Sequence, residues 1–353
     1  MKDAFQEGID RRQDMFSMGQ WDDSAPECIA CGGRRHSVIR EGFDDRYGQP
    51  DLFAVSQCRD CGQIVTVPRL SDAALPALYA TYYPRKQVAI KDIVRESRAA
   101  GSTLRRILRW IHGTNNQGQY LARPGQRVLD IGCGSCLSLL EAKSLGAEPY
   151  GVEADPNVEW IARELGLRVH IGSLLDDPFP GVFFDLVVLN QVIEHVPDPA
   201  ALLNRLRTIL APGGRIFLSF PNTRSLWCRW FGPCWINWHI PYHLHHFHID
   251  SFSKFATRCG FRIERSRTLT PNLWTSLQFR AVKYVPVRGR ACPIWQADLS
   301  VKVSRGFRAR VNRFLRSFVR LPVLVLILGV NRIADALNLG DSIVVILRPR
   351  ERM

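Results

Sequence analysis

The stretch "RVLDIGCGSC", residues 127–136, decides the fold of this 353-residue chain. It is a short apolar run closed by glycines, which predicts a buried strand, a tight loop and a following helix. Glycines in such a loop let a ligand approach the backbone closely. Downstream, "GVEAD" at 151–155 ends a second predicted strand with an acid, Glu153, which lies 21 residues beyond Gly132. That separation suits a carboxylate that binds two ribose hydroxyls, so we expect a ligand at the carboxyl ends of these strands.

Strand-like and helix-like segments alternate through the middle of the chain. Further strands are predicted at 167–172, 184–190 and 214–220, and helices at 137–146, 156–166 and 198–214. Strands that alternate with helices of about ten to fifteen residues indicate right-handed βαβ units and a buried parallel sheet. We therefore predict an α/β fold with a doubly wound, Rossmann-like sheet.

Three zones divide the chain. Residues 1–85 carry two Cys-x-x-Cys pairs, 86–270 hold the alternating strands and helices, and 271–353 are basic, then apolar, and end in a strand-like run. A hydrophobic content of 46% beside 23% charged residues indicates a globular protein and excludes disorder across the whole chain. The N-terminal segment has no apolar run of the secretory type, so we expect a cytoplasmic protein whose cysteines are thiols or metal ligands.

At the glycine loop the chain resembles the class I S-adenosylmethionine-dependent methyltransferases. Asp130, Gly132 and Gly134 match the family's acid-x-Gly-x-Gly pattern, and the likeness spans about 120–265. It implies S-adenosylmethionine as the cofactor. The residues that it implies for cofactor binding are Asp130, Gly132, Gly134, Glu153, Ser173 or the backbone of Leu174, Asn190 and Gln191. A dinucleotide enzyme is the competing interpretation, but such enzymes normally have a third glycine where this chain has Leu137.

The run "NQVIEHVPDP", residues 190–199, follows the fourth predicted strand, where cofactor and substrate should meet. Methyl transfer to a hydroxyl benefits from a base, and histidine suits that role near neutral pH. We expect Glu194 and His195 to face the substrate; the alternative is that they cap the following turn. Some quinone O-methyltransferases have a similar Glu-x-x-Glu-His run that binds a divalent metal. This chain has Gln191 in place of the first glutamate, and a single acid argues against magnesium.

The segment "NWHIPYHLHHFHI", residues 237–249, contains five of the nine histidines. Methyltransferases of the group that this chain resembles often carry Pro-x-His-Leu-x-x-Phe here. The match singles out His243 as a general base or substrate anchor, with His195 as the next candidate. A metal site within the segment would need at least three of its histidines to converge, and Pro241 disfavours the continuous helix that would bring them together.

Two cysteine pairs, Cys28-x-x-Cys31 and Cys58-x-x-Cys61, are separated by 26 residues. Such pairs are the expected ligand set of a structural zinc, with redox dithiols as the alternative. The segment also resembles the N-terminal zinc segment of certain bacterial methyltransferases that are associated with sugars, surface polysaccharides and natural products. On that resemblance the ribbon is a structural platform and substrate lid, stabilised by zinc.

The net charge is +14, and residues 280–320 contain eleven Lys/Arg and one acid. Residues 303–330 predict a basic amphipathic helix that contacts an anionic membrane; the alternative is a helix that packs over the sheet with a solvated basic face. The ten uncharged residues at 321–330 are too few to span a bilayer. We therefore expect peripheral contact at the inner face of the membrane.

For the whole chain we expect methyl transfer to a hydroxyl, less often a carbon, of a sugar, polysaccharide precursor or natural product. A lipid-linked sugar would explain the membrane contact. The alternatives are a quinone or phenol O-methyltransferase, an RNA-binding or RNA-modifying zinc-ribbon protein, and a structural pseudoenzyme. The ribbon lacks the aromatic and basic platform typical of single-strand binders, so we do not expect a nucleic-acid partner.

Overall fold

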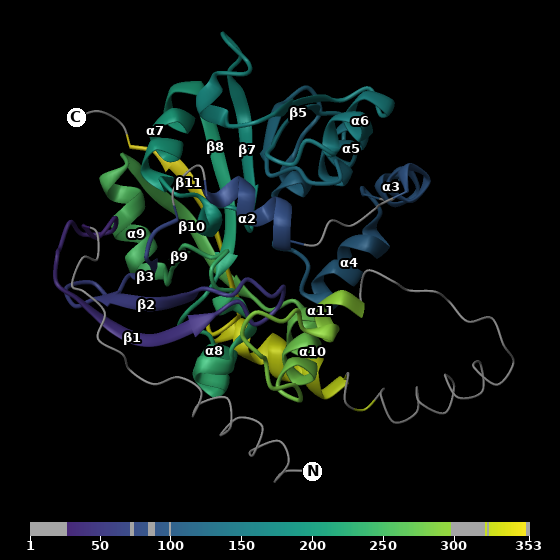
Figure 1. Ribbon diagram of the computed structural model, residues 1–353. Helices are drawn as coiled ribbons and strands as arrows, with labels where there is room; N and C mark the ends of the chain where they lie inside the picture. Colours follow the sequence, from purple (N-terminus) through teal and green to yellow (C-terminus); the bar gives the residue numbers. More distant parts are fainter. Residues whose placement is uncertain are drawn as a thin grey trace, which may run out of the picture.

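A computed structural model describes residues 27–70, 74–83, 89–98, 100–297, 322 and 325–350 (Figure 1). Its strands form a seven-stranded sheet and a four-stranded sheet. The larger sheet contains the glycine loop, and the smaller one carries the first cysteine-rich zone.

The seven-stranded sheet is mixed. Its parallel strands β4 to β8 are β4 (Arg127–Ile131), β5 (Glu148–Glu153), β6 (Arg168–Ile171), β7 (Phe184–Asn190) and β8 (Leu210–Pro221). β11 (Ser342–Pro349) lies antiparallel between β8 and β10 (Phe261–Leu269), which gives the order β10-β11-β8-β7-β4-β5-β6. The α/β prediction is confirmed, but the sheet is not wholly parallel because the last strand of the chain enters it in reverse.

Helices cover both faces of this sheet. Across the described residues, not only on this sheet, the helices are α2 (Ala74–Tyr82), α3 (Ile90–Ser97), α4 (Thr103–His112), α5 (Leu137–Ser144), α6 (Val158–Glu164), α7 (Pro199–Ile209), α8 (Leu226–Phe231), α9 (Ile249–Arg258), α10 (Asn272–Ala281) and α11 (Pro293–Ala297), and residues 325–336 are also helical. Successive residues of a strand point to opposite faces. In β4, Leu129 packs in one cluster with Leu203 of α7 and Phe252 of α9, whereas Val128 packs in another with Ala142 of α5.

The start of α7 follows from its sequence, whereas its end differs from the prediction. Asp198 caps the helix by accepting the N–H groups of Ala200 and Ala201 at 3.0 and 2.9 Å, and Pro199 fits the first turn. β8 begins at Leu210, so it includes the Pro-Gly-Gly segment that was expected to end the helix.

The four-stranded sheet joins two distant parts of the chain. It has the order β1 (His36–Phe43), β2 (Leu52–Cys58), β3 (Ile64–Val67) and β9 (His245–His246). β3 pairs antiparallel with β9, with Ile64 opposite His246 and Val65 opposite His245. The cysteine-rich zone is therefore built together with the histidine segment, although the sequence places them in separate zones.

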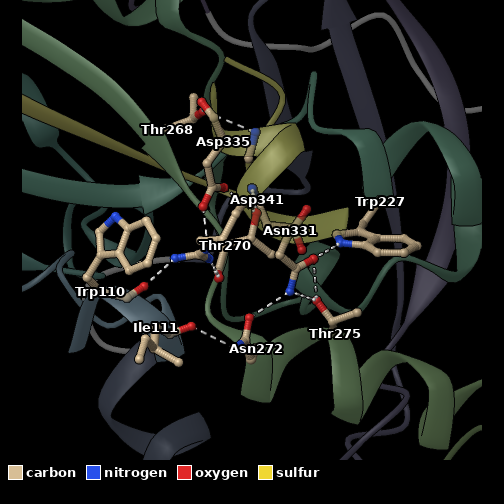
Figure 2. Close-up of polar contacts among 12 residues, drawn as sticks. Trp110, Ile111, Trp227, Thr268, Thr270, Asn272, Thr275, Asn331, Asp335 and Asp341 are labelled. Carbon is tan, nitrogen blue, oxygen red and sulfur yellow. Dashed lines mark hydrogen bonds and ion pairs between the residues drawn. The ribbon is translucent and has the colours of Figure 1, made fainter. Parts of the chain in front are cut away.

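A buried polar network attaches the helix at 325–336 to its neighbours (Figure 2). Asn331 Oδ1 accepts the Trp227 indole N–H at 2.8 Å, and its Nδ2 donates to Asn272 Oδ1 at 2.9 Å. Of the predicted amphipathic helix at 303–330, residues 303–321, 323 and 324 lie outside the described residues. Within the described part of the chain, no helix is both long enough and apolar enough to cross a membrane.

Candidate functional site

Gly132 and Gly134 form the turn between β4 and α5. Both have left-handed backbone, with φ of +72° and +53°, which glycine adopts without strain. The Gly132 N–H donates to the Val152 carbonyl at 2.8 Å and holds the loop against β5. A Cβ at Gly132 would meet the Val192 side chain at 2.7 Å, whereas a Cβ at Gly134 would meet no described atom within 4 Å. The backbone at Gly134 therefore faces open space that a ligand can enter.

Glu153, at the end of β5, reaches this loop. Its Oε2 accepts the Gly134 N–H at 2.7 Å, and its Oε1 accepts the N–H groups of Ala154 and Asp155 at 2.8 and 3.0 Å. Carboxylate oxygens have further lone pairs for hydrogen bonding. The structure thus brings the acid expected to bind ribose to the glycine loop, and its contact with the ribose stays a prediction.

Asp130 lies beneath the loop. It is 3% exposed, and its Oδ2 accepts a hydrogen bond from the Ser138 hydroxyl of α5. Burial raises the pKa of Asp130 to about 7, because the charged form loses its hydration. The hydrogen bond joins β4 to α5 and so fixes the loop between them; a direct contact of Asp130 with the cofactor stays a prediction.

Ser173 and Leu174 follow β6 at the same edge of the sheet, at the start of the short 3₁₀ helix η2 (Leu174–Asp176). The Ser173 hydroxyl accepts the Leu175 N–H at 3.1 Å, and the Ser173 N–H donates to Asp176 Oδ2 at 2.8 Å. Asp176 is a carboxylate at this turn that the sequence interpretation did not consider. The Ser-x-x-Asp spacing of a capping box is the pattern that could have revealed it.

Asn190 is the last residue of β7 and Gln191 follows it, and both side chains are held by protein groups. Asn190 Oδ1 accepts the Gly118 N–H at 3.1 Å. The Gln191 amide lies 3.1 Å from the hydroxyls of Ser219 and Ser342. With its oxygen facing those hydroxyls, its nitrogen donates to Glu194 Oε1 at 3.3 Å. These contacts position the strand end, and a contact with the methionine moiety stays a prediction.

Glu194, His195 and His243 converge next to this strand end. One potential ligand atom of each lies within 4.8 Å of the others, and the two imidazole rings are 4.6 Å apart between centroids. Glu194 and His195 belong to the 3₁₀ helix η3 (Ile193–His195), and His243 comes from the segment before β9. The sequence interpretation named all three as catalytic candidates, and the structure brings them together.

Backbone carbonyls fix both imidazoles. His195 Nδ1 lies 2.9 Å from the Tyr242 carbonyl oxygen, and His243 Nδ1 lies 2.8 Å from that of Asn237. A carbonyl only accepts, so each Nδ1 carries the proton, and each Nε2 has a free lone pair when the ring is neutral. The Tyr79 hydroxyl also lies 3.0 Å from His195 Nδ1.

Burial controls the charge of this cluster. It raises the pKa of Glu194 to about 8 and lowers the pKa of His195 to about 4. The pKa of His243 is also well below its ordinary value, first through burial and then through the neighbouring His195. Near neutral pH both rings are therefore uncharged, which is the form that can accept a proton or bind a metal.

Four tyrosines pack beside these histidines and form what we call the tyrosine cluster: Tyr47, Tyr79, Tyr83 and Tyr242. Their ring centroids are 5.1 Å apart for Tyr47 and Tyr83, 5.4 Å for Tyr79 and Tyr242, and 5.3 Å for Tyr83 and Tyr242. Three of the four come from the N-terminal zone. The sequence interpretation missed this cluster, although "YATYYP" at 79–84 is unusually rich in tyrosine.

Three other histidines of the segment have structural contacts. His246 Nε2 lies 2.9 Å from the Thr66 hydroxyl, and His245 Nε2 lies 3.4 Å from the Pro197 carbonyl oxygen. His248 Nδ1 accepts a hydrogen bond from the backbone N–H of Ser251, the third residue of α9, at 3.3 Å. Among the residues described, no three histidines of the segment form a possible metal-ligand group by themselves.

The cysteine pairs form a second cluster. Cys28 Sγ lies 3.5 Å from Cys61 Sγ, Cys31 Sγ lies 3.6 Å from Cys58 Sγ, and none of these thiols is in a disulfide. A tetrahedral zinc with Zn–S bonds of about 2.3 Å would place its sulfurs about 3.8 Å apart. A disulfide would need about 2.05 Å. The four sulfurs therefore fit a shared zinc ion.

Comparison with known proteins identifies the middle of the chain as a methyltransferase domain. Residues 102–266 match the family model described as a methyltransferase domain. Two curated relatives are the ubiquinone biosynthesis O-methyltransferases of Xanthomonas campestris pv. campestris (strain B100), 36% identical over 110 residues, and Xylella fastidiosa (strain 9a5c), 35% identical over 108 residues. The alignments cover 29% and 28% of this chain, but only 46% and 43% of those relatives.

Among solved structures, a SAM-dependent methyltransferase from Archaeoglobus fulgidus aligns with a TM-score of 0.40 and 19% identity, over 73% of this chain and 94% of that one. The family match shows that the chain contains a methyltransferase domain, for which S-adenosylmethionine is the expected cofactor. The open backbone at Gly134 and the carboxylate of Glu153 beside it fit such a cofactor.

Proposed function

We propose that this protein transfers the methyl group of S-adenosylmethionine to a phenolic hydroxyl of a small-molecule acceptor. The observation that carries the proposal is the tyrosine cluster beside Glu194, His195 and His243. Aromatic side chains pack favourably against a planar ring, and neutral imidazoles can act on its hydroxyl. The names of the curated relatives support a quinone- or phenol-type acceptor. The sugar acceptor that we expected first from the sequence has no such support.

Bound S-adenosylmethionine supplies an electrophilic methyl carbon and a neutral leaving group. The glycine loop and Glu153 hold it at the carboxyl ends of β4 and β5. The acceptor hydroxyl loses its proton to the histidine cluster, by which we mean Glu194, His195 and His243, as its oxygen bonds to the methyl carbon. S-adenosylhomocysteine is the leaving group. His243, fixed through its Nδ1, is the residue that we assign to the acceptor, as a base or as an anchor.

The test is turnover with two panels of acceptors. Purified protein is incubated with S-adenosylmethionine and either phenols with alkyl or prenyl substituents or sugar nucleotides, and methylated products are identified by mass spectrometry. We expect turnover of phenols and a loss of about 100-fold or more in His243→Ala. His248→Ala, which changes the histidine that caps α9, is the matched control. Turnover of sugar nucleotides alone would overturn the proposal, and steeply salt-dependent RNA affinity would favour the RNA-binding alternative.

We also propose that Cys28, Cys31, Cys58 and Cys61 hold a structural zinc. The support is the four-sulfur geometry. Zinc would stabilise the turns that precede β1 and β3, and β3 pairs with β9 of the histidine segment. The proposed role of the ribbon is therefore to support the loop that carries His243.

Membrane contact is a further part of the proposal. The apolar side chains of α4 and of the helix at 325–336 are exposed, with Trp110 57% and Leu326 66% accessible. The Arg332 guanidinium donates to the Trp110 carbonyl at 2.7 Å, so the two helices are neighbours. Arg106 on α4 is exposed and supplies a positive charge for anionic headgroups. These features support peripheral contact by a surface that combines α4 with the part of the region expected from the sequence that includes Leu326.

A further inference from the structure

We propose that the acceptor carries a carboxylate, separate from the reacting hydroxyl, and that this group binds a set of buried hydrogen-bond donors. The set, which we call the donor cluster, consists of Arg46, Asn237, His239 and Tyr242. Each of these residues is more than nine-tenths buried. Each has one side-chain atom without a hydrogen-bond partner among the described residues: Arg46 Nε, Asn237 Nδ2, His239 Nε2 and Tyr242 Oη. The inference rests on the proposed function, because it concerns the same acceptor site.

One hydrogen bond and several ring contacts bring the donor cluster together. Arg46 follows β1, and its Nη2 donates to the Ile236 carbonyl, in the segment that carries the other three donors. The rings of His239 and Tyr242 are 4.9 Å apart between centroids. Tyr47, the residue after Arg46, has its ring centroid 5.8 Å from that of His239 and 5.5 Å from that of Tyr242. Donors from two distant parts of the chain therefore meet beside the tyrosine cluster.

Arg46 supplies the positive charge of the donor cluster. Its Nε lies 3.8 Å from Asp45 Oδ1, which is longer than a hydrogen bond, and its guanidinium lies over the Trp295 ring, 4.2 Å from the centroid. Burying a charge without a close partner costs free energy, and an anionic ligand would remove part of that cost. Burial, and then the charge of Arg46, lower the pKa of His239. The His239 ring is therefore neutral, and its one N–H can donate to the same ligand.

The turn that carries Arg46 is fixed by its own sequence. The Asp44 carboxylate accepts the backbone N–H groups of Arg46 and Tyr47, both at 2.9 Å, and that of Gln49 at 3.1 Å. Aspartate commonly stabilises turns in this way. The Arg46 carbonyl in turn accepts the Cys292 N–H at 2.8 Å. Because the backbone is already ordered, little conformational freedom is lost when a ligand binds Arg46.

The chemistry of the donor cluster indicates a carboxylate. Its members offer N–H and O–H donors and one positive charge, and a carboxylate accepts hydrogen bonds and carries one negative charge. The reacting hydroxyl is assigned to His243, whose ring centroid is 4.9 Å from that of His239. The donor cluster thus adjoins the proposed base without containing it. We therefore expect one aromatic acceptor to present its hydroxyl to His243 and its carboxylate to Arg46.

The experiment compares ligands that differ in charge but hardly in shape. Calorimetric titration of the full chain, without cofactor, measures the binding of 3- and 4-hydroxybenzoate and of the corresponding hydroxybenzamides. We expect the wild type to bind one of the hydroxybenzoates about tenfold or more tightly than its amide, and Arg46→Met to lose this preference. Arg288→Met, which changes an exposed arginine that donates to the Pro50 carbonyl, is the matched control and should keep it. Equal or undetectable binding of acid and amide by the wild type would overturn the carboxylate site.

Two further measurements identify the source of any loss. Thermal unfolding checks that Arg46→Met folds; if it does not, Tyr242→Phe, which removes only the unpaired hydroxyl, decides by a smaller preference for the acid. S-adenosylmethionine also has a carboxylate, so each variant is titrated with the cofactor. Unchanged cofactor affinity in Arg46→Met would support the acceptor site, whereas a tenfold loss would assign the donor cluster to the cofactor and overturn the inference.

The binding measurements and the turnover measurements can fail separately. A preference for the acid that depends on Arg46, without methylation of any phenol, would contradict the proposed function alone. Methylation of phenols without a preference for the acid would contradict the carboxylate site alone.

Discussion

A methyl group added at Gly134 should separate cofactor binding from folding. Gly134 has a φ of +53°, and a Cβ there would meet no described atom within 4 Å. Gly166, which follows α6, has a φ of +60° and equally open surroundings. Ligands of open α/β sheets bind at the carboxyl ends of the strands, and Gly166 lies at the opposite edge, before β6. Gly166→Ala is therefore a matched control for Gly134→Ala.

The expected magnitudes follow from the backbone and the open space. A left-handed conformation costs a residue with a Cβ about 1–2 kcal/mol, and the lower entropy of the unfolded chain offsets about 0.4–1 kcal/mol of that. Both variants should therefore lose about 1 kcal/mol of stability. Only Gly134→Ala places its methyl group where the cofactor approaches, so only there do we expect S-adenosylmethionine affinity to fall about tenfold or more, which is about 1.4 kcal/mol.

Calorimetric titration with S-adenosylmethionine and denaturant unfolding measure the two quantities separately. Similar losses of stability combined with a loss of affinity in Gly134→Ala alone would support the cofactor site. If Gly134→Ala binds S-adenosylmethionine as tightly as Gly166→Ala does, the glycine loop does not contact the cofactor, and the reasoning from open space is refuted.

Three further predictions concern the rest of the molecule. Cys58→Ser should lower the zinc content by one ion per chain and expose the ribbon to limited proteolysis; unchanged zinc would contradict the four-cysteine site. Burial raises the pKa of Asp341 to about 7, so the folded state holds a proton that the unfolded state has released, and stability should fall as pH rises from about 4 to 7. Between pH 5 and 7 the wild type should therefore lose up to about 2 kcal/mol more than Asp341→Asn in denaturant titrations, whereas parallel pH curves would show no such linkage. Trp110→Ser with Leu326→Ser should reduce sedimentation with phosphatidylglycerol vesicles about tenfold, while Leu175→Ser, an exposed site elsewhere, should not; sedimentation that is indifferent to anionic lipid would exclude the contact.

The central sheet could be predicted because its determinants are local. Each of the parallel strands β4 to β8 is a short apolar run, and Glu153 lies only 21 residues beyond Gly132 of the glycine loop. Adjacent parallel strands then bring loop and acid together. β10 was not predicted, because its sequence FRIERSRTL is rich in arginine and is not an apolar run. The antiparallel entry of β11 could not be predicted in the same way, since the direction of a strand that returns after a long insertion is decided by its partners β8 and β10.

The histidine cluster depends on contacts between distant parts of the chain, and the sequence showed only its members. "NQVIEHVPDP" and the segment at 237–249 each contained a candidate, but the distance between His195 and His243 depends on how the segment folds back over η3. The members of the tyrosine cluster are even further apart along the chain. Tyr47 and Tyr83 belong to the N-terminal zone, and their rings contact Tyr242 of the histidine segment. Residue spacing along one strand or helix carries no information about such contacts.

The pairing of β3 with β9 gives the ribbon a direct effect on the candidate site. The Thr66 hydroxyl on β3 donates to the His243 carbonyl at 2.7 Å and lies 2.9 Å from His246 Nε2. The Thr66 N–H donates to the Leu244 carbonyl at 3.0 Å. β3 begins three residues after Cys61, so the strand that holds His243 is also the strand that follows the second cysteine pair. If the cysteines hold zinc as proposed, loss of that zinc should loosen the segment that carries His243, because β3 contacts this segment through Thr66.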